Sequence, residues 1–406
     1  MEIGPILSSL RRNKLGAALI ALQIALTLAI VCNSLFIIDG RTTRMQRPSG
    51  VDEANVFTLG NQLLGRPQDV KSRVQADLAA LRSLPGVVDA MASNSFPLRG
   101  RGSNTRLDRE RRDTFDSPAP RTARYFVDEH VGDAWGLSLL AGRWFTAGDT
   151  LEMRTGDQPN PAAIIVTKAL AEQLFPGQSA VGRTAWFLDK STQIVGVVET
   201  LQTPWAATDL GETYVSNAVL LPVLYLGNGL QYSVRTRPGE RDATLQAARR
   251  LLFELDRARV VDNLRPFEET RAQRYRGDRA LRLILGAVSA LLLGVTACGI
   301  VGITNFWIVE RRGQIGVRRA LGATRMHILR YFHTENLLIA GAGVAIGVVL
   351  AVCTNLWMVK SFQMTRMGVP FVLGGAVIVI VLGQCAVLWP ALRAASVPPA
   401  LATRSG

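Results

Sequence analysis

Four long apolar blocks constrain this chain more than any other feature of its sequence. They cover residues 15–38, 283–309, 337–359 and 369–392, and none of them contains Asp, Glu, Lys or Arg. About 20 apolar residues span the hydrocarbon core of a bilayer, and a charged side chain at its centre costs about 2.5 to 3.5 kcal/mol on insertion scales. Since 19% of the chain is charged, these blocks predict four transmembrane helices rather than the buried helices of a soluble core.

The first block also has to be distinguished from a cleaved signal peptide. It follows basic residues, as a signal core does, but its apolar run covers residues 15–38. A signal core is shorter, about 7 to 15 residues, and is followed by a small-x-small cleavage site that is not evident here. We therefore expect a retained membrane anchor.

Basic residues flank the four blocks unequally and predict the orientation of the chain. The connection between the third and fourth blocks has only Lys360 and Arg366. The N-terminal flank, the connection between the second and third blocks, and the C-terminal tail are richer in Lys and Arg, namely Arg11, Arg12, Lys14, Arg311, Arg312, Arg318, Arg319, Arg325, Arg330, Arg393 and Arg404. Because short basic flanks stay in the cytoplasm, both termini are predicted to be cytoplasmic.

These patterns divide the chain into nine expected segments. They are a cytoplasmic N-terminal segment (1–14), transmembrane helix 1 (15–38), an extracytoplasmic domain with a stalk (39–280), transmembrane helix 2 (281–309), a cytoplasmic loop (310–332), transmembrane helix 3 (333–359), a short external loop (360–368), transmembrane helix 4 (369–392) and a cytoplasmic tail (393–406). The polar stretch 266–282 has only Pro266 and Gly277 as helix breakers. It is therefore expected to extend the second membrane helix outward as one stalk.

The extracytoplasmic segment shows two β-α-β patterns. Strand 54–59, helix 68–84 and a strand through Val87 and Val88 form the first, and strand 230–236, helix 240–255 and strand 259–264 form the second. Two such units suggest a ferredoxin-like split arrangement. The insertion between them, about 95–225, is expected to be mostly β, with strands at 162–166, 184–188 and 193–198 around a helix at 168–174. The predicted fold class is thus a four-helix membrane protein with a large α/β extracytoplasmic domain.

Composition argues against several functions. The net charge of +14 is partly explained by basic membrane flanks, which attract anionic lipids. The basic stretch 99–112 lacks the interleaved aromatic residues of a nucleic-acid site and is interpreted as a solvated loop, in preference to an anionic-ligand site. The cysteines Cys32, Cys298, Cys353 and Cys385 all lie in apolar blocks, so the extracytoplasmic domain contains no disulfide. They are interpreted as small packing residues.

The sequence gives little support for an enzyme. His130 is the only histidine of the extracytoplasmic segment, and a serine hydrolase or zinc site requires a histidine with partners. Its neighbours Asp128, Glu129 and Asp133 suggest a surface loop instead. A G-x-x-x-x-G-K-[ST] phosphate loop is also missing, because the nearest match, residues 65–72, has Val70 at the second glycine position. We therefore expect no cofactor, no metal site and no ATPase activity of the chain's own.

The loop after the second block carries the most specific motif. Residues 310–330 read ERRGQIGVRRALGATRMHILR, a basic and amphipathic stretch. This loop resembles the hallmark E-R-R-x-x-I-G-x-R-R-A-L-G-A of the FtsX-like permease family. The matching residues are Glu310, Arg311, Arg312, Ile315, Gly316, Arg318, Arg319, Ala320, Leu321, Gly322 and Ala323.

Further motifs extend the resemblance over essentially the whole chain. Gly142-Arg143-Trp144-Phe145, the stretch from Ala171 to Gly182 and Ile194-Val195-Gly196-Val197-Val198 are similar to the periplasmic core domain of MacB-type permeases. Residues 8–14 and the C-terminal stretch from Pro390 to Pro398 also have family character.

The resemblance implies an ABC transporter permease in the bacterial inner membrane. Its partners would be a cytosolic ABC ATPase subunit docked on the 310–330 loop, a second copy or related permease as dimer, membrane lipids, and in some systems a periplasmic adaptor. ATP-driven closure of the ATPase would move the external domain, a process called mechanotransmission. That motion would serve efflux or extraction of a drug, peptide, lipid or lipoprotein.

Two other functions remain open on the sequence. The first is a signalling or scaffold membrane protein that activates an external partner such as a cell-wall hydrolase. The size of the external domain favours the exporter over this alternative. The second is a membrane enzyme active in its external domain, which the isolated histidine disfavours.

Overall fold

The computed structural model describes residues 14–396, apart from 65–68, 113–118, 155, 188, 206–213, 228 and 363–364. The chain forms two compact units. One, called here the helical unit, combines Met1–Met45 with Gly277–Gly406, and the other, the α/β unit, covers Gln46–Arg276. The family-like motif at residues 8–13 and Pro398 lie outside the described residues.

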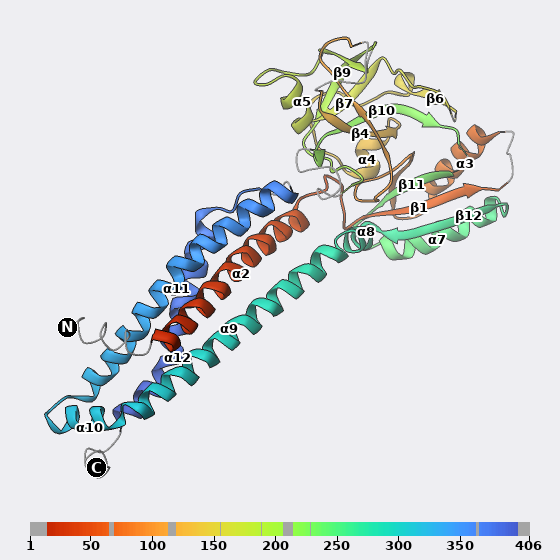
Figure 1. Ribbon diagram of the computed structural model, residues 1–406. Helices are drawn as coiled ribbons and strands as arrows, with labels where there is room; N and C mark the ends of the chain where they lie inside the picture. Colours follow the sequence, from red (N-terminus) through yellow and green to blue (C-terminus); the bar gives the residue numbers. More distant parts are fainter. Residues whose placement is uncertain are drawn as a thin grey trace. The chain divides into compact units, whose positions relative to one another are not determined.

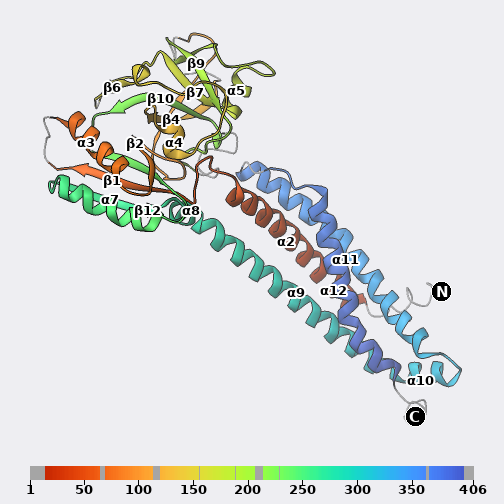
Figure 2. The same ribbon diagram turned by 180° about the vertical axis from the view of Figure 1, so that it is seen from behind.

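The helical unit contains the four apolar blocks in four long helices. They are α2 (Lys14–Gln46), α9 (Arg276–Glu310), α11 (Arg325–Phe362) and α12 (Val369–Ala395), and the short helix α10 (Arg312–Ala320) connects α9 to α11. All four long helices are long and apolar enough to cross a membrane. They run alongside one another in both views (Figures 1 and 2), which confirms the predicted four-helix membrane part.

Close packing between α2 and α11 depends on two glycines. A Cβ atom at Gly343 would lie 2.8 Å from the carbonyl oxygen of Ala21, and one at Gly347 would lie 2.9 Å from that of Ala25. Small residues allow membrane helices to approach each other in this way. Gly341, by contrast, faces open space and does not contribute to this helix crossing.

Polar side chains, among them Gln23, Thr27 and Gln384, form hydrogen bonds between the long helices. Gln23 Nε2 donates to the Val295 carbonyl oxygen at 3.0 Å, and the hydroxyls of Thr27 and Thr296 are 2.8 Å apart. The His333 ring contacts Gln384 Oε1 at 2.7 Å. These bonds join α2 to α9 and α11 to α12, which gives each helix pair a defined register.

The α/β unit begins and ends in one four-stranded sheet. Its strands β1 (Val56–Leu63), β2 (Val87–Ser93), β11 (Gly229–Thr236) and β12 (Arg259–Pro266) lie in the order β12-β1-β11-β2, with antiparallel neighbours. The helices α3 (Val70–Ser83) and α7 (Arg241–Leu255) complete the β-α-β-β-α-β order of the ferredoxin-like split arrangement. Its core is formed by buried apolar residues from both strands and helices, among them Phe57, Leu78, Tyr232 and Leu252.

The insertion between β2 and β11 forms a second, mixed sheet. Its main path is β3 (Ser103–Arg106), β4 (Arg121–Val127), β10 (Ala218–Tyr225), β7 (Ala163–Thr167), β9 (Lys190–Val198) and β5 (Leu139–Gly142). β6 (Leu151–Met153) pairs with β10, and β8 (Thr184–Phe187) pairs with β9. The helices of this part are α4 (Val131–Trp135), the short η1 (Ala147–Asp149) and α5 (Lys168–Leu174). The expected strands and helix of the insertion are present as β7, β8, β9 and α5, whereas β3, β4, β5, β6 and β10 were not predicted.

Two sequence-based expectations were wrong in detail. The stretch 99–112 is not a solvated loop throughout, because Ser103–Arg106 is a strand and Leu107 is fully buried. The stalk is not one continuous helix either. The short helix α8 (Phe267–Arg274) ends at Tyr275 before α9 begins. Phe267 and Tyr275 are both buried, so α8 packs as part of the α/β unit.

Candidate functional site

The site predicted from sequence is the segment from Glu310 to Ala323, which contains helix α10. The figure places α10 where the chain turns from α9 into α11 (Figure 1). The amide of Arg311 donates to the Trp307 carbonyl oxygen at 3.0 Å, and the amide of Ile315 donates to the Arg311 carbonyl oxygen at 3.0 Å. Helical hydrogen bonding therefore continues through the junction while the backbone of Arg311 leaves helical geometry.

Arg311 attaches this junction to α11. Its Nη1 donates to both carboxylate oxygens of Glu335, at 3.0 and 3.1 Å, and its guanidinium lies 5.6 Å from the centre of the Trp307 ring. The Glu335 side chain is only 2% exposed. A buried charge is tolerated only when it is paired, so the role of Arg311 is to hold α9, α10 and α11 together.

A backbone motif at Leu321-Gly322-Ala323 ends α10. The Gly322 amide donates to the Arg319 carbonyl oxygen at 3.2 Å, and the Ala323 amide donates to that of Arg318 at 3.0 Å. This pair of bonds defines a Schellman C-cap, which requires a left-handed residue that is usually glycine. Gly322 has a φ of 97°. The glycine of the motif therefore serves to reverse the chain.

The remaining motif residues divide between the inside and the outside of the segment. Ile315 and Gly316 are buried, and Arg319 and Ala323 are half-buried. Glu310, Arg312, Arg318, Ala320, Leu321 and Gly322 are exposed. The structure thus brings Arg311, Ile315 and Gly316 into the helix packing and turns Arg312, Arg318 and Leu321 to the surface.

The outward face of this segment combines cations with large apolar side chains. Leu321 is 83% exposed, Met326 62% and Val317 51%. The Arg318 guanidinium lies 5.3 Å from the centre of the Tyr331 ring, which fixes one of the cations beside them. Val317 and Leu321 lie between the candidate spans α9 and α11, and Met326 lies in the first turn of α11, before the apolar block 337–359. Exposed apolar side chains at such positions are typical of a surface that binds another protein. We call Val317, Arg318, Leu321 and Met326 the α10 surface.

Glu335 and Met326 were missed by the sequence interpretation. Met326 follows the motif and gave no signal of its own. Glu335 had one, because it is the only acidic residue after Glu310. A lone acid close to six arginines at a membrane boundary indicates a buried ion pair.

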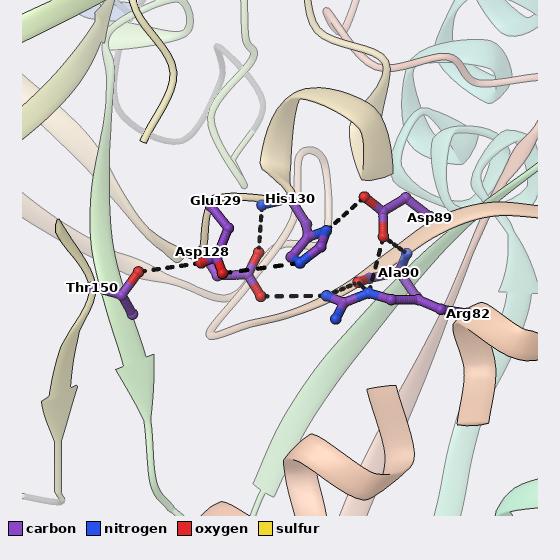
Figure 3. A network of polar contacts seen from close by, with 7 residues as sticks. All are labelled: Arg82, Asp89, Ala90, Asp128, Glu129, His130 and Thr150. Carbon is purple, nitrogen blue, oxygen red and sulfur yellow. Dashed lines mark hydrogen bonds and ion pairs between the residues drawn. The ribbon is translucent and has the colours of Figure 1, made fainter. Parts of the chain in front are cut away.

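His130 lies in the turn between β4 and α4 with 33% of its side chain exposed, and it is part of a polar network that Figure 3 shows. Its Nδ1 lies 2.8 Å from Asp89 Oδ2, and its amide donates to Asp128 Oδ1 at 3.0 Å. Arg82 Nε donates to Asp89 Oδ1 at 2.9 Å, and Arg82 Nη2 lies 3.8 Å from Asp128 Oδ2. Burial raises the pKa of Asp128 to about 6, although His130 and Arg82 act in the opposite direction.

This network joins the two parts of the α/β unit and has no catalytic geometry. Arg82 and Asp89 belong to α3 and β2, whereas Asp128 and His130 lie between β4 and α4. His130 makes no hydrogen bond to a Ser or Cys side chain of the described chain, so no hydrolytic triad is formed. Within the same described residues, no cluster of three His, Cys, Asp or Glu is placed to hold a metal ion.

Taken together, four candidate membrane spans, a short amphipathic connecting helix and a large α/β unit define a membrane permease with an extracytoplasmic domain. Two family descriptions match the chain. "MacB-like periplasmic core domain" matches residues 17–251, and "FtsX-like permease C-terminal" matches residues 286–399. The chain therefore belongs to the FtsX-like permeases with a MacB-like periplasmic core domain, which are ABC transporter permeases of the MacB type.

Curated relatives agree with this assignment at low identity. The macrolide export ATP-binding/permease protein MacB of Azoarcus sp. (strain BH72) is 26% identical over 377 residues, which cover 86% of this chain and 51% of the relative. The pyoverdine export ATP-binding/permease protein PvdT of Pseudomonas savastanoi pv. phaseolicola is 25% identical over 403 residues, which cover 97% of this chain and 58% of the relative. The uncharacterized ABC transporter permease YknZ of Bacillus subtilis is 23% identical over 274 residues, which cover 67% of this chain and 64% of the relative. The chain thus spans between about half and two thirds of these relatives.

Two solved structures align with part of the chain. The extracellular domain of YknZ aligns over 51% of this chain with a TM-score of 0.32 and 19% identity. The periplasmic region of MacB from Actinobacillus actinomycetemcomitans aligns over 56% with a TM-score of 0.33 and 16% identity.

Proposed function

We propose that this chain couples ATP hydrolysis by a separate cytosolic ABC ATPase to movement of its periplasmic domain. The proposal places both termini and α10 in the cytoplasm, with the α10 surface seated in a groove of the ATPase. One observation carries the proposal, namely that Val317, Leu321 and Met326 are exposed together outside the apolar blocks. Contiguous exposed apolar side chains mark protein-binding surfaces, and arginine, here Arg318, is enriched among the residues that carry most of the binding energy at such interfaces.

The transported molecule belongs, in this proposal, to the substances that such permeases export or extract from the periplasmic side. Two relatives are named for export of a macrolide and of pyoverdine. Their names support efflux as the outcome of the coupled motion, which would act on a drug, peptide, lipid or lipoprotein. A dimer of this chain, or of this chain with a related permease, would match a pair of ATPase subunits.

Replacement of Leu321 by Asp tests the docking site. Because Leu321 is 83% exposed, the change leaves the packing of α10 intact and places a charge in the proposed interface. We expect the ATPase that co-purifies with the tagged chain from native membranes to be lost in Leu321→Asp. Leu255→Asp, a change of the same type at a 47% exposed leucine of α7, should retain it. Equal recovery of the ATPase with both variants would contradict the proposed docking site.

A further inference from the structure

A cavity of about 740 Å³ lies in the insertion of the α/β unit. Its walls come from β3, β4, β8, β10 and the beginning of β9, together with the connecting segments next to them. The backbones of Asp108 and Trp186 form a β-bridge there. The Asp108 amide nitrogen donates to the Trp186 carbonyl oxygen at 3.0 Å, and the Trp186 amide nitrogen donates to the Asp108 carbonyl oxygen at 2.7 Å. This bridge links the chain after β3 to β8, so the sheet closes on itself around the cavity. A volume of this size is typical of a small-molecule site.

Positive charge dominates the cavity walls. The charged side chains that line it are Arg106, Arg112, Arg121, Arg124, Lys190, Asp108 and Asp189, which give a net charge of +3. Arg112 is paired with Asp108 at 3.1 Å. Arg121 and Lys190 form no ion pair with any residue that the structure describes. Such cations attract anions.

Arg124 is the most informative of these cations because it is partly buried without a carboxylate partner in the described chain. It donates to the Ser103 hydroxyl at 3.3 Å, and its guanidinium lies 5.3 Å from the centre of the Phe126 ring. Burial lowers the pKa of Arg124, which shows that its charged form loses solvation there. An anion in the cavity would restore that lost stabilisation.

The rest of the lining is apolar. Trp186, Phe187, Leu221 and Pro159 line the same cavity. A phosphate or sulfate ion alone would contact the cations and leave these side chains and most of the volume unused. The lining therefore suits a larger molecule that has an acidic group at one end and an apolar body at the other.

We propose that this cavity is a binding site for an amphipathic organic anion. The acidic group lies among Arg121, Arg124 and Lys190, and the apolar body lies against Trp186, Phe187 and Leu221. The site is independent of ATPase docking, so its test has a binding readout and does not depend on the proposed function.

Calorimetric titration of the full chain in phosphatidylcholine nanodiscs tests the site. The probe is naphthalene-1-sulfonate, and its uncharged counterpart is naphthalene-1-sulfonamide. We expect the sulfonate to bind saturably and the sulfonamide at least tenfold more weakly. The double variant Arg121→Gln/Lys190→Gln should weaken sulfonate binding at least tenfold. Arg249→Gln/Arg250→Gln removes two exposed cations from α7 and should change the Kd less than twofold.

Three results would overturn the proposal. They are the absence of saturable sulfonate binding to the unmodified chain, equal affinity for sulfonate and sulfonamide, and equal loss of binding in the two double variants. Competition then identifies the body of the natural anion. Displacement of the probe by decanoate alone supports an acyl chain, and displacement by N-acetylphenylalaninate alone supports an aromatic or peptide group. Displacement by neither would contradict a general site for amphipathic anions.

Discussion

At the scale of single residues, a buried charge pair between Arg311 and Glu335 stabilises the helical unit. Arg311 and Glu335 are 12% and 2% exposed and form two hydrogen bonds. Lys71 and Glu152 form the opposite case, because their side chains are 45% and 51% exposed. Removing one partner of a buried pair leaves an uncompensated charge, whereas an exposed pair contributes little.

We therefore expect Arg311→Ala to lower the free energy of unfolding by about 3 to 5 kcal/mol. Lys71→Ala, the control, should lower it by less than about 1 kcal/mol. Denaturant unfolding of both variants in detergent measures the difference. The double change Arg311→Met/Glu335→Leu should recover most of the loss, since it removes both charges. Equal stability of the two single variants would refute the structural role of Arg311.

Burial of Asp128 makes the stability of the fold depend on pH, with a sign that follows from its raised pKa. Burial raises its pKa from the ordinary 3.8 to about 6, so the folded state binds the proton more tightly than the unfolded state. The charged groups that face it are Arg82, His130 and Glu129. Its contribution to stability is therefore fully present below the ordinary pKa and is lost as the pH rises through about 6.

Asp128→Asn should remove this dependence. Between pH 3.8 and about 6, the stability of the variant relative to the unmodified chain should rise by on the order of 2 kcal/mol. Thermal unfolding of the full chain, followed by near-UV circular dichroism across this range, measures the change. Asp242→Asn, at a side chain that is 83% exposed, is the control and should run parallel to the unmodified chain. Parallel behaviour of Asp128→Asn would contradict the prediction.

At the scale of secondary-structure elements, glycines determine where helices end and how closely they pack. Gly322 adopts the left-handed conformation that ends α10. Gly313 lies inside the same helix with nothing within 4 Å of a Cβ. Alanine in place of Gly322 would be strained in the left-handed conformation, whereas alanine in place of Gly313 would favour the helix.

Gly322→Ala should destabilise α10 by about 1 kcal/mol, and Gly313→Ala should stabilise it by about 0.5 to 1 kcal/mol. Hydrogen exchange of the amides of residues 312–323 is the measurement, with faster exchange expected in the first variant and slower exchange in the second. The same direction of change in both variants would rule out the capping role.

Helix packing between α2 and α11 allows a similar comparison. At Gly347 a side chain would meet the α2 backbone, whereas Gly341 faces open space. Gly347→Leu should cost about 1 to 3 kcal/mol through overpacking. Gly341→Leu should change the free energy of unfolding by close to zero. Thermal unfolding in detergent distinguishes them, and equal midpoints would show that α2 and α11 are not in close contact.

Periodic apolar patterns made most elements predictable. The helix at residues 168–174 was predicted with the bounds of α5, and the two β-α-β patterns gave the split four-stranded sheet. β4, with the sequence RTARYFV, was missed because its alternation is interrupted by Arg124, which faces a cavity. The polar network of His130 was missed for a related reason, since its partner Asp89 is 41 residues away. Contacts between distant residues leave no local pattern in a single sequence.

The candidate site was only partly predictable on the same grounds. The motif identified the segment from Glu310 to Ala323, but only the fold separates Arg311 and Gly322, which hold the segment in shape, from Leu321, which lies at its surface. Contact of that surface with an ATPase stays a prediction.

At the scale of the whole molecule, the proposed function requires that an ATPase bound at α10 acts on the α/β unit. α9 begins at Arg276, the last residue of the α/β unit, and ends at Glu310, with only Arg311 between it and α10. In the sequence, the single helix α9 therefore connects the α/β unit to α10. Nucleotide-dependent change at α10 should consequently alter the α/β unit, which contains the proposed anion site.

Hydrogen exchange of residues 46–276 in the complex with its co-purified ATPase, with and without ATP and vanadate, tests this claim most directly. We expect nucleotide to change the exchange of amides in the α/β unit of the unmodified chain and of Leu255→Asp. Leu321→Asp, which is expected to lose the bound ATPase and is therefore mixed with added ATPase, should show no nucleotide effect. Identical exchange with and without nucleotide in the unmodified chain, while the ATPase remains bound and active, would contradict coupling between the two.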